Sequence, residues 1–244
     1  MKIILGIEST AHTFGIAVTK GKKVLSNVKK GYTTESGGII PMQAAKHHEK
    51  HRDDLLEQSL EEAKVKIEDI DLIAYSAGPG LGPCLRVGKE LVEELNIKYK
   101  IPFIEVNHCV AHLEVVKVLT KAKDPVLLYT SGANTQVIAF EGGKYRIFGE
   151  TLDQGVGNFL DSFGRYIGLG FPGGPKISAL SEKSKNYIQL PYVVKGMDVS
   201  FAGILTKLKQ MYDSKEFKTE DLAYSMQETI FAMLLEVAER AMAH

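Results

Sequence analysis

The chain has 244 residues, of which 44% are hydrophobic and 25% are charged, and thirty basic side chains balance thirty acidic ones. This length allows one large domain or two smaller lobes. A net charge of zero predicts no general affinity for nucleic acid, no stretch has the roughly eighteen uninterrupted apolar residues of a membrane helix, and the two cysteines, Cys84 and Cys109, lack the CxxC spacing of a zinc ribbon. We therefore expect a cytoplasmic protein with reduced thiols.

The first half of the sequence alternates between strand and helix patterns. Three apolar runs between residues 2 and 28 predict an antiparallel meander, and Pro41 opens a long helix. The buried run DLIAYSAG, the loop GPGLGP and the helix LRVGKELVEEL follow. PFIEV is another buried strand, after which Asn107 is expected to cap a helix that extends to about Leu119. This order indicates an α/β lobe.

The meander pattern occurs twice. The segment Leu5 to Lys22 matches the segment Leu127 to Lys144 at eight of eighteen positions without a gap. A repeat of this kind predicts two lobes of one fold, residues 1–124 and 125–244. After its meander the second half shows only helical segments, so we expect a second lobe that lacks its final strands.

The lysines of one predicted hairpin and the segment Lys46 to Arg52 are the strongest local basic clusters. The hairpin lysines are Lys20, Lys22, Lys23, Lys29 and Lys30. Clusters of this kind are more often solvated faces than binding sites.

The turns of the two meanders, EST and TSGANT, are rich in hydroxyl groups and glycine. Such turns can present hydroxyls and backbone N–H groups to phosphate oxygens, which suits a nucleotide site, although they also occur as plain hairpin turns. In LDQGVGNFLDSFGR two glycines precede a helix on which Asp161 can accept bonds from ribose hydroxyls, and FPGGP allows close approach of a ligand. An exposed helix acid and a tight loop are the alternatives.

Two histidine pairs have the spacing that places both rings on one helix face. His108 and His112 directly follow a buried strand, at the edge where α/β folds bind ligands, and can hold a metal ion. His47 and His51 lie within a highly charged helix, where a solvated face is the better explanation. Cys109 stands where a zinc peptidase of the HExxH type needs its general base, so peptidase activity is disfavoured. Tyr129 is a candidate third ligand.

Several blocks together resemble one known family: GIESTAHT, PMQAAKHHEKH, SAGPGLGPCLRVG, VNHCVAH, YTSGANTQV, ETLDQGVGNFLD, GLGFPGGPK, KGMDVSFAG and the final helix. The chain is similar over its whole length to the catalytic subunit of the KEOPS complex, the tRNA N6-adenosine threonylcarbamoyltransferase family of archaea and eukaryotes. The resemblance implies a duplicated actin-like ATPase fold, related to ribonuclease H, with two lobes around a nucleotide cleft.

The resemblance also implies the activity and its partners. A threonylcarbamoyl group would pass from threonylcarbamoyl-AMP to N6 of the adenine beside the anticodon in tRNAs that read ANN codons. ATP or the adenylate would bind in the cleft beside one iron or zinc ion. The partners would be tRNA and the small kinase, dimerising and adaptor subunits of the complex.

Matched position by position, the resemblance assigns His108, His112 and Tyr129 to the metal. It assigns to the nucleotide or adenylate Tyr129, Thr130, Ser131, Gly132, Ala133, Asp161, Gly174 and Ser178. Ala133 replaces the second glycine of the family's SGG turn, and Ser178 stands where archaeal relatives have glutamate. The family also continues beyond MAH into a glycine-rich adenosine segment and an aspartate ligand, so we expect this chain not to turn over alone.

Two other classes of function stay open from the sequence. An actin-like ATPase or small-molecule phosphotransferase would use the histidine pair for packing only. A non-catalytic binding module is also consistent with the fold, but it would be expected to lack the metal pair.

Overall fold

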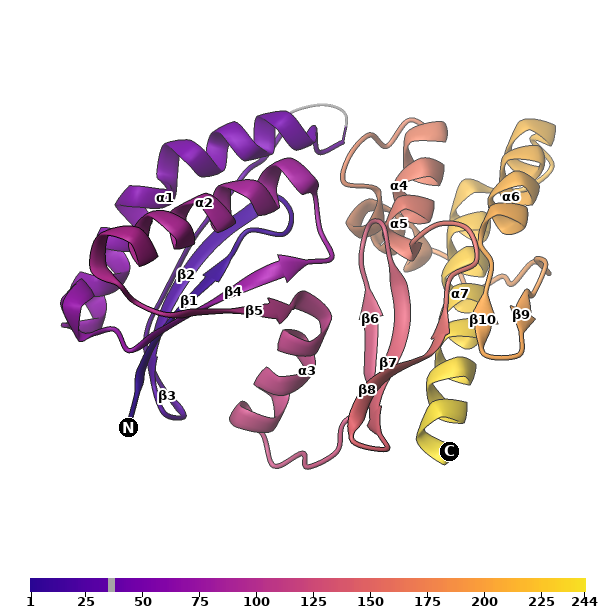
Figure 1. Ribbon diagram of the computed structural model, residues 1–244. Helices are drawn as coiled ribbons and strands as arrows, with labels where there is room; N and C mark the ends of the chain where they lie inside the picture. Colours follow the sequence, from indigo (N-terminus) through magenta and orange to yellow (C-terminus); the bar gives the residue numbers. More distant parts are fainter. Residues whose placement is uncertain (35–37) are drawn as a thin grey trace. The chain divides into compact units, whose positions relative to one another are not determined.

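The computed structural model describes residues 1–34 and 38–244 (Figure 1). Two compact units make up the chain: residues 1–34 and 39–121 form unit 1, and residues 122–244 form unit 2. Each unit has its own cluster of buried hydrophobic side chains. The assignment of residues 1–124 and 125–244 to two lobes of a duplicated fold stays a prediction.

Unit 1 contains a five-stranded sheet in the order β3-β2-β1-β4-β5. Its strands are β1 (Ile3–Glu8), β2 (Thr13–Lys20), β3 (Lys23–Gly31), β4 (Leu72–Gly78) and β5 (Phe103–Asn107). The first three form the predicted antiparallel meander, whereas β4 and β5 run parallel to β1. The carboxyl ends of β1, β4 and β5 therefore lie at one edge of the sheet.

The helices of unit 1 are α1 (Pro41–Ala63), the short η1 (Ile67–Asp69), α2 (Gly82–Tyr99) and α3 (His108–Leu119). Helices α1 and α2 pack side by side on one face of this sheet, and α3 follows β5 (Figure 1). The alternate side chains Phe14, Ile16 and Val18 of β2 are buried in the same core as the apolar residues of α1 and α2. Pro41 is at the start of α1, and the Asn107 side chain accepts bonds from the N–H groups of Cys109 and Val110 at 3.0 and 3.2 Å, as predicted.

The expectation of a solvated face for the second histidine pair is wrong in part. His47 is half-buried and its ring packs against Tyr32, with 5.8 Å between centroids, and against His51 at 4.6 Å. The neighbouring His48 is fully buried beside Phe14 and lies 2.9 Å from the carbonyl oxygen of Ala11. Burial lowers the pKa of both His47 and His48. The His47 and His48 side chains therefore pack against the meander, whereas Lys46, Glu49 and Lys50 of the same part of α1 are exposed.

Unit 2 begins with the second predicted meander, a three-stranded antiparallel sheet in the order β6-β7-β8. Its elements are β6 (Leu127–Thr130), β7 (Thr135–Glu141), β8 (Lys144–Glu150), α4 (Val156–Tyr166), α5 (Gly173–Ser181), β9 (Val194–Lys195), β10 (Asp198–Val199), α6 (Ala202–Ser214) and α7 (Thr219–Ala243). The small β9–β10 ribbon has no counterpart among the sequence predictions. In the described residues no helix is both long and apolar enough to cross a membrane.

A carboxylate from a distant loop caps α6. Asp153 accepts bonds from the N–H groups of Phe201 and Ala202, at 3.0 and 2.9 Å, and from the Ser200 hydroxyl at 2.6 Å. Burial raises the pKa of Asp153, but the bonds from Ser200 and the backbone outweigh this effect and lower the pKa to about 2. The loop after β8 is thereby fixed to the start of α6.

Candidate metal and nucleotide site

Three side chains meet where the parallel strands of unit 1 end. Glu8 is the last residue of β1, Ser76 lies near the end of β4, and His108 begins α3 directly after β5. Because Ile7 of β1 pairs with Tyr75 of β4, the residues that follow them lie at nearly the same level. Glu8 Oε2 lies 3.0 Å from His108 Nδ1 and also accepts a hydrogen bond from the Ser76 hydroxyl. The carboxyl edge of the sheet thus builds a polar centre around His108.

The two histidines of α3 point toward one another. His108 Nε2 and His112 Nε2 are 3.1 Å apart, and the ring centroids are separated by 4.6 Å. Two nitrogen ligands of a tetrahedral metal ion, each at about 2.05 Å, lie about 3.3 Å from one another. The pair therefore has the separation that a shared metal ion requires.

Glu8 supplies the outer partner that metal-binding histidines typically have. Its carboxylate faces Nδ1 of His108, while Nε2 of the same ring faces His112. An ionised carboxylate can only accept, so Nδ1 carries the proton and Nε2 keeps its lone pair. Partial burial, followed by the proximity of His108, lowers the pKa of His112, which favours the neutral ring that binds metals.

Two ligands do not close a metal site. Among the described residues no group of three His, Cys, Asp or Glu side chains is arranged to hold a metal ion. Tyr129, the proposed third ligand, lies on β6 of unit 2, and its participation stays a prediction. Cys109, between the histidines, is buried, and burial raises the pKa of its thiol, so it does not supply a thiolate.

The first meander turn differs from the expectation that its hydroxyls address phosphate. The backbone N–H of Thr10 donates to Glu8 Oε1 at 2.7 Å, and the Thr10 hydroxyl donates to the same oxygen. Burial raises the pKa of Glu8, but the bonds from His108, Ser76 and Thr10 outweigh it and lower the pKa to about 2. The turn donors therefore hold the Glu8 carboxylate in its ionised form.

Glycines of the GPGLGP loop and of α2 allow this turn to pack closely. A Cβ atom on Gly80 would lie 2.5 Å from the Thr10 carbonyl oxygen, and one on Gly88 would lie 2.3 Å from the Ser9 hydroxyl. The Leu81 N–H donates to the Thr10 carbonyl at 2.7 Å. The start of α2 thus fixes the turn that orients Glu8.

The second meander turn is packed on a helix start in the same way. The Ser131 and Gly132 carbonyl oxygens accept bonds from the N–H groups of Gly157 and Asn158, each at 3.0 Å. A Cβ atom on Gly155 would lie 2.5 Å from the Gly132 oxygen. Gly155 and Gly157, before and within α4, therefore allow the backbone of the turn to pack directly on the start of the helix. The sequence alone did not decide this role.

The turn itself is closed by Ser131 and Asn134. The Ser131 N–H donates to the Asn134 oxygen at 2.8 Å, and the Asn134 N–H donates to the Ser131 hydroxyl at 3.0 Å. Thr130, Gly132 and Ala133 are exposed, and Tyr129 is half-exposed. The central residues of the turn therefore lie at the surface of the chain.

The Asp161 carboxylate caps a helix, and its expected contact with a ribose stays a prediction. Its Oδ1 accepts a bond from the Gly173 N–H at 2.7 Å and so caps the start of α5. A Cβ atom on Gly173 would lie 2.8 Å from the Asp161 Cα, whereas one on Gly174 would meet only Leu160 Cδ1 at 3.8 Å. Ser178 is exposed on α5. Packing of the described residues thus requires glycine at position 173 but not at position 174.

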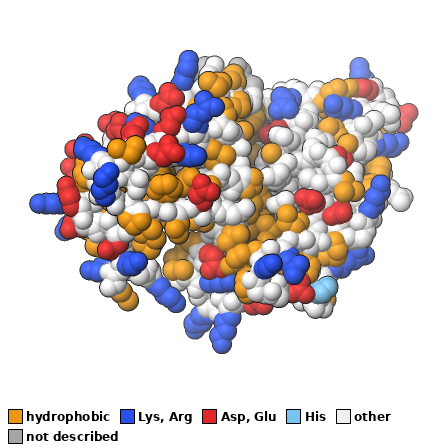
Figure 2. Space-filling model, viewed as in Figure 1, with side chains coloured by type: hydrophobic (Ala, Val, Ile, Leu, Met, Phe, Trp, Pro, Cys, Tyr) orange, Lys and Arg blue, Asp and Glu red, His pale blue; other side chains and the backbone are white. Residues whose placement is uncertain are grey.

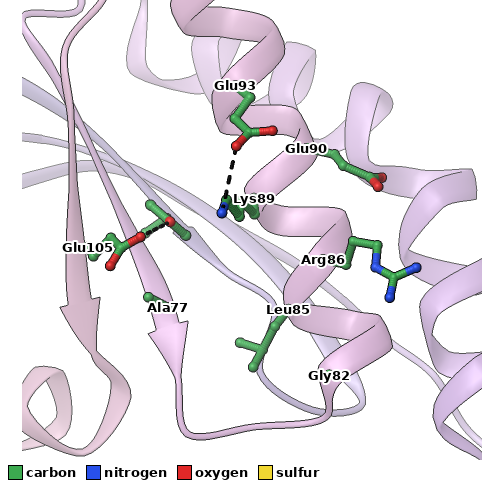
Figure 3. Close-up of a pocket in the computed structure, with 9 residues that line it drawn as sticks. Ala77, Gly82, Leu85, Arg86, Lys89, Glu90, Glu93 and Glu105 are labelled. Carbon is green, nitrogen blue, oxygen red and sulfur yellow. Dashed lines mark hydrogen bonds and ion pairs between the residues drawn. The ribbon is translucent and has the colours of Figure 1, made fainter.

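A separate pocket of about 510 Å³ lies in unit 1 between α2 and the strands β4 and β5 (Figure 3). Its charged lining includes Arg86, Lys89, Glu93 and Glu105, and Lys89 pairs with Glu93 at 3.8 Å. The buried Tyr75 donates a 2.7 Å bond to Glu105. Burial, followed by this bond, raises the pKa of Tyr75 to about 12. Neither histidine of α3 lines this pocket, and we assign no chemistry to it.

Comparison with known proteins identifies the family. Residues 23–244 match the family model described as TsaD, tRNA N6-adenosine threonylcarbamoyltransferase. The protein of that name from Thermococcus sibiricus is 57% identical over 242 residues, which are 99% of this chain and 74% of the relative. The chain belongs to this family.

Other relatives extend the comparison. The Thermococcus kodakarensis protein of the same name is also 57% identical over 242 residues, with the same two coverages. A Methanosarcina acetivorans protein, called a probable bifunctional tRNA threonylcarbamoyladenosine biosynthesis protein, is 51% identical over 99% of this chain and 44% of its own length.

Solved structures show the fold. HypF of T. kodakarensis has a TM-score of 0.65 at 12% identity, covering 98% of this chain and 40% of its own. Component A of (R)-2-hydroxyglutaryl-CoA dehydratase from Acidaminococcus fermentans has a TM-score of 0.54 at 15% identity. The match covers 98% of this chain and 79% of that protein. These likenesses show a mixed α/β fold, the class that the order of strands and helices predicted. The duplicated actin-like architecture with an incomplete second lobe stays a prediction.

Proposed function

We propose that the protein transfers a threonylcarbamoyl group from threonylcarbamoyl-AMP to N6 of the adenine beside the anticodon in tRNAs that read ANN codons. Membership in the family supports the reaction class and the tRNA substrate. The observation in the structure that supports it best is the convergence of His108 Nε2 and His112 Nε2, with Glu8 on the outer nitrogen of His108.

Within this proposal, His108, His112 and Tyr129 hold one iron or zinc ion. The ion would supply Lewis acidity toward substrate oxygens. Glu8 would keep His108 in the tautomer that binds metal, and Thr10 and Ser76 would keep Glu8 ionised. An actin-like phosphotransferase with a purely structural histidine pair would need neither the convergence of the two nitrogens nor the outer carboxylate.

We assign the nucleotide to residues of unit 2. The exposed turn residues Thr130, Gly132 and Ala133 would contact the phosphate of ATP or of the adenylate. Gly174 would admit close approach of the ligand, because packing does not require glycine there. Asp161 would bind the ribose and would also fix the start of α5. Ser178 lies exposed on the same helix.

The proposed partners are tRNA and the kinase, dimerising and adaptor subunits of the complex, and the proposed compartment is the cytoplasm. Catalysis of such a transfer rests mainly on positioning and on stabilisation of charge. The amine at N6 attacks the carbamoyl carbon of the adenylate, and AMP leaves.

The test is transfer of labelled threonylcarbamoyl from its adenylate to a tRNA that reads ANN codons, with the partner subunits present. Loss of both proposed metal ligands in His108→Ala/His112→Ala should lower the rate by at least about 100-fold, since changing a residue that only contacts a ligand already costs about 10- to 100-fold. The matched control is His47→Ala/His51→Ala, which removes the other pair of the same spacing and should retain the rate within about threefold. An unmodified adenine with the wild-type chain and its partners would refute the proposal.

A further inference from the structure

The first meander carries a local excess of positive charge. Residues 9–34 contain five lysines and no aspartate or glutamate, in a chain whose total charge is zero. The lysines are Lys20, Lys22, Lys23, Lys29 and Lys30, which we call the lysine row. All five are exposed, and among the described residues none forms an ion pair with a carboxylate. Figure 2 shows Lys and Arg side chains at the lower left of the view, over the part of unit 1 that holds β3.

The lysine row extends along the edge strand β3 from its first residues to its last. At one end Lys20 of β2 pairs with Lys23 of β3, and Lys22 lies in the turn between them. At the other end Lys29 and Lys30 precede the last residue of β3, which runs parallel to β1 and ends at the same edge as Glu8. Lys29 lies six residue steps along the strand from Lys23, a distance of about 20 Å.

Lys29 and Glu8 lie on the same face of the sheet with only a glycine between them. Gly15 pairs with Glu8 on one side and with Lys29 on the other. A Cβ atom on Gly15 would be 3.7 Å from the Lys29 Cβ and 3.9 Å from the Glu8 Cβ. Because Gly15 has no side chain, nothing on the middle strand separates Lys29 from the centre built by Glu8 and His108.

We propose that the lysine row binds the sugar–phosphate backbone of the tRNA and leads it toward the Glu8–His108 centre. This inference rests on the proposed function, which makes tRNA the substrate. Unpaired, solvated ammonium groups suit phosphates, which they position without reading sequence. A row of about 20 Å spans several successive phosphates, and its local field acts even though the net charge of the chain is zero.

The experiment measures tRNA binding by the 244-residue chain as a function of salt. The variant Lys20→Gln/Lys22→Gln/Lys23→Gln removes three charges at the end of the row farthest from Glu8. The control Lys183→Gln/Lys185→Gln/Lys207→Gln removes three exposed lysines of unit 2 that also lack an ion pair among the described residues. Lys20→Arg/Lys22→Arg/Lys23→Arg keeps the charge, and equal melting temperatures show that each variant is folded.

The glutamine variant of the row should reduce the slope of log K against log salt by about two, since each neutralised phosphate contributes roughly 0.7 to 0.9. The unit 2 control and the arginine variant should keep the wild-type slope within about 0.5. Equal slopes for the row variant and the unit 2 control would overturn the inference. It would also be overturned if the row variant bound tRNA as the wild type does but no longer bound an acidic protein partner.

A second readout separates this inference from the proposed function. With the partner subunits present, the glutamine variant should raise the apparent KM for tRNA several-fold and leave the rate at saturating tRNA unchanged. If the wild-type chain binds tRNA through the lysine row but transfers no threonylcarbamoyl group, the proposed function is refuted and the proposed tRNA-binding surface stands. Normal transfer with an unaltered KM in the variant would refute the surface and retain the function.

Discussion

At the scale of single residues, the carboxylate of Glu8 determines which nitrogen of His108 is directed at His112. It accepts from Nδ1 and leaves Nε2 directed at His112, 3.1 Å away. The spacing of the two histidines and their place after a strand were sufficient to predict their pairing. Glu8 was not predicted as their partner, because it lies 100 residues earlier and only the strand order β1-β4-β5 brings it beside them.

Glu8→Gln is expected to weaken metal binding by about tenfold or more, because a neutral amide supports the His108 tautomer and its basicity less well. The measurement is the dissociation constant for zinc or cobalt, titrated into the metal-free chain. Glu105→Gln is the control, since Glu105 also accepts a side-chain bond in unit 1, from Tyr75. Equal affinities for the two variants would mean that Glu8 has no part in binding.

At the scale of elements, each meander turn is fixed to the start of a helix by glycines. Gly80 and Gly88 serve the first turn, and Gly155 and Gly157 serve the second. Apolar periodicity and turn residues were enough to predict both meanders and the main helices. They did not predict that carbonyl oxygens of the second turn accept hydrogen bonds from N–H groups of α4. Such bonds join segments that are separate in the sequence, and local patterns do not show which segments meet in space.

Gly155→Ala is expected to lower the free energy of unfolding by about 1–3 kcal/mol, because its Cβ would lie 2.5 Å from the Gly132 carbonyl oxygen and would displace the turn. Urea unfolding measures the effect. Gly203→Ala is the control, since a Cβ there has no neighbour within 4 Å and alanine favours a helix by up to about 1 kcal/mol. A Gly155→Ala chain as stable as the wild type would contradict the packing argument.

The cap of α6 predicts a dependence of stability on pH. The pKa of Asp153 is lowered to about 2 in the folded chain, below its ordinary value of 3.8. Its contribution is therefore complete above about pH 5 and decreases as the pH falls from there toward 2.

Asp153→Ala should cost about 0.5–2 kcal/mol at pH 7, the usual range for loss of a cap, and the difference from wild type should shrink toward pH 3. Urea unfolding at pH 7, 4 and 3 measures it, with the exposed Asp54→Ala on α1 as the control. A difference that stays constant over this range would exclude the charged cap as its cause.

At the scale of the whole chain, the two units have separate cores. Phe14 and Ile73 belong to the core of unit 1, and Phe159 and Phe201 to that of unit 2. The internal repeat led us to expect two lobes, residues 1–124 and 125–244, because two copies of a meander each need a core of their own, and that assignment stays a prediction. The repeat could not predict that the lysines of the first meander are exposed without ion pairs among the described residues, because this depends on which side chains the folded sheet presents to solvent.

Residues 1–121 are expected to unfold cooperatively on their own and to bind zinc through His108 and His112. Circular dichroism and metal titration test this, with His108→Ala/His112→Ala in the same fragment as the control. If Tyr129 is a ligand, the fragment should bind more weakly than the whole chain, and Tyr129→Phe should reduce the whole chain to the same affinity. A fragment that is unfolded would refute the independence of the unit 1 core.

The hydrogen bond between His108 and Glu8 also makes the centre visible to spectroscopy. Because the Glu8 carboxylate can only accept, nitrogen-15 resonance should report the tautomer of His108 that carries its proton on Nδ1. Arrival of a metal would then shift the Nε2 resonance and leave the Nδ1 proton in place. Occupancy of the centre can thus be followed atom by atom in solution, without any substrate.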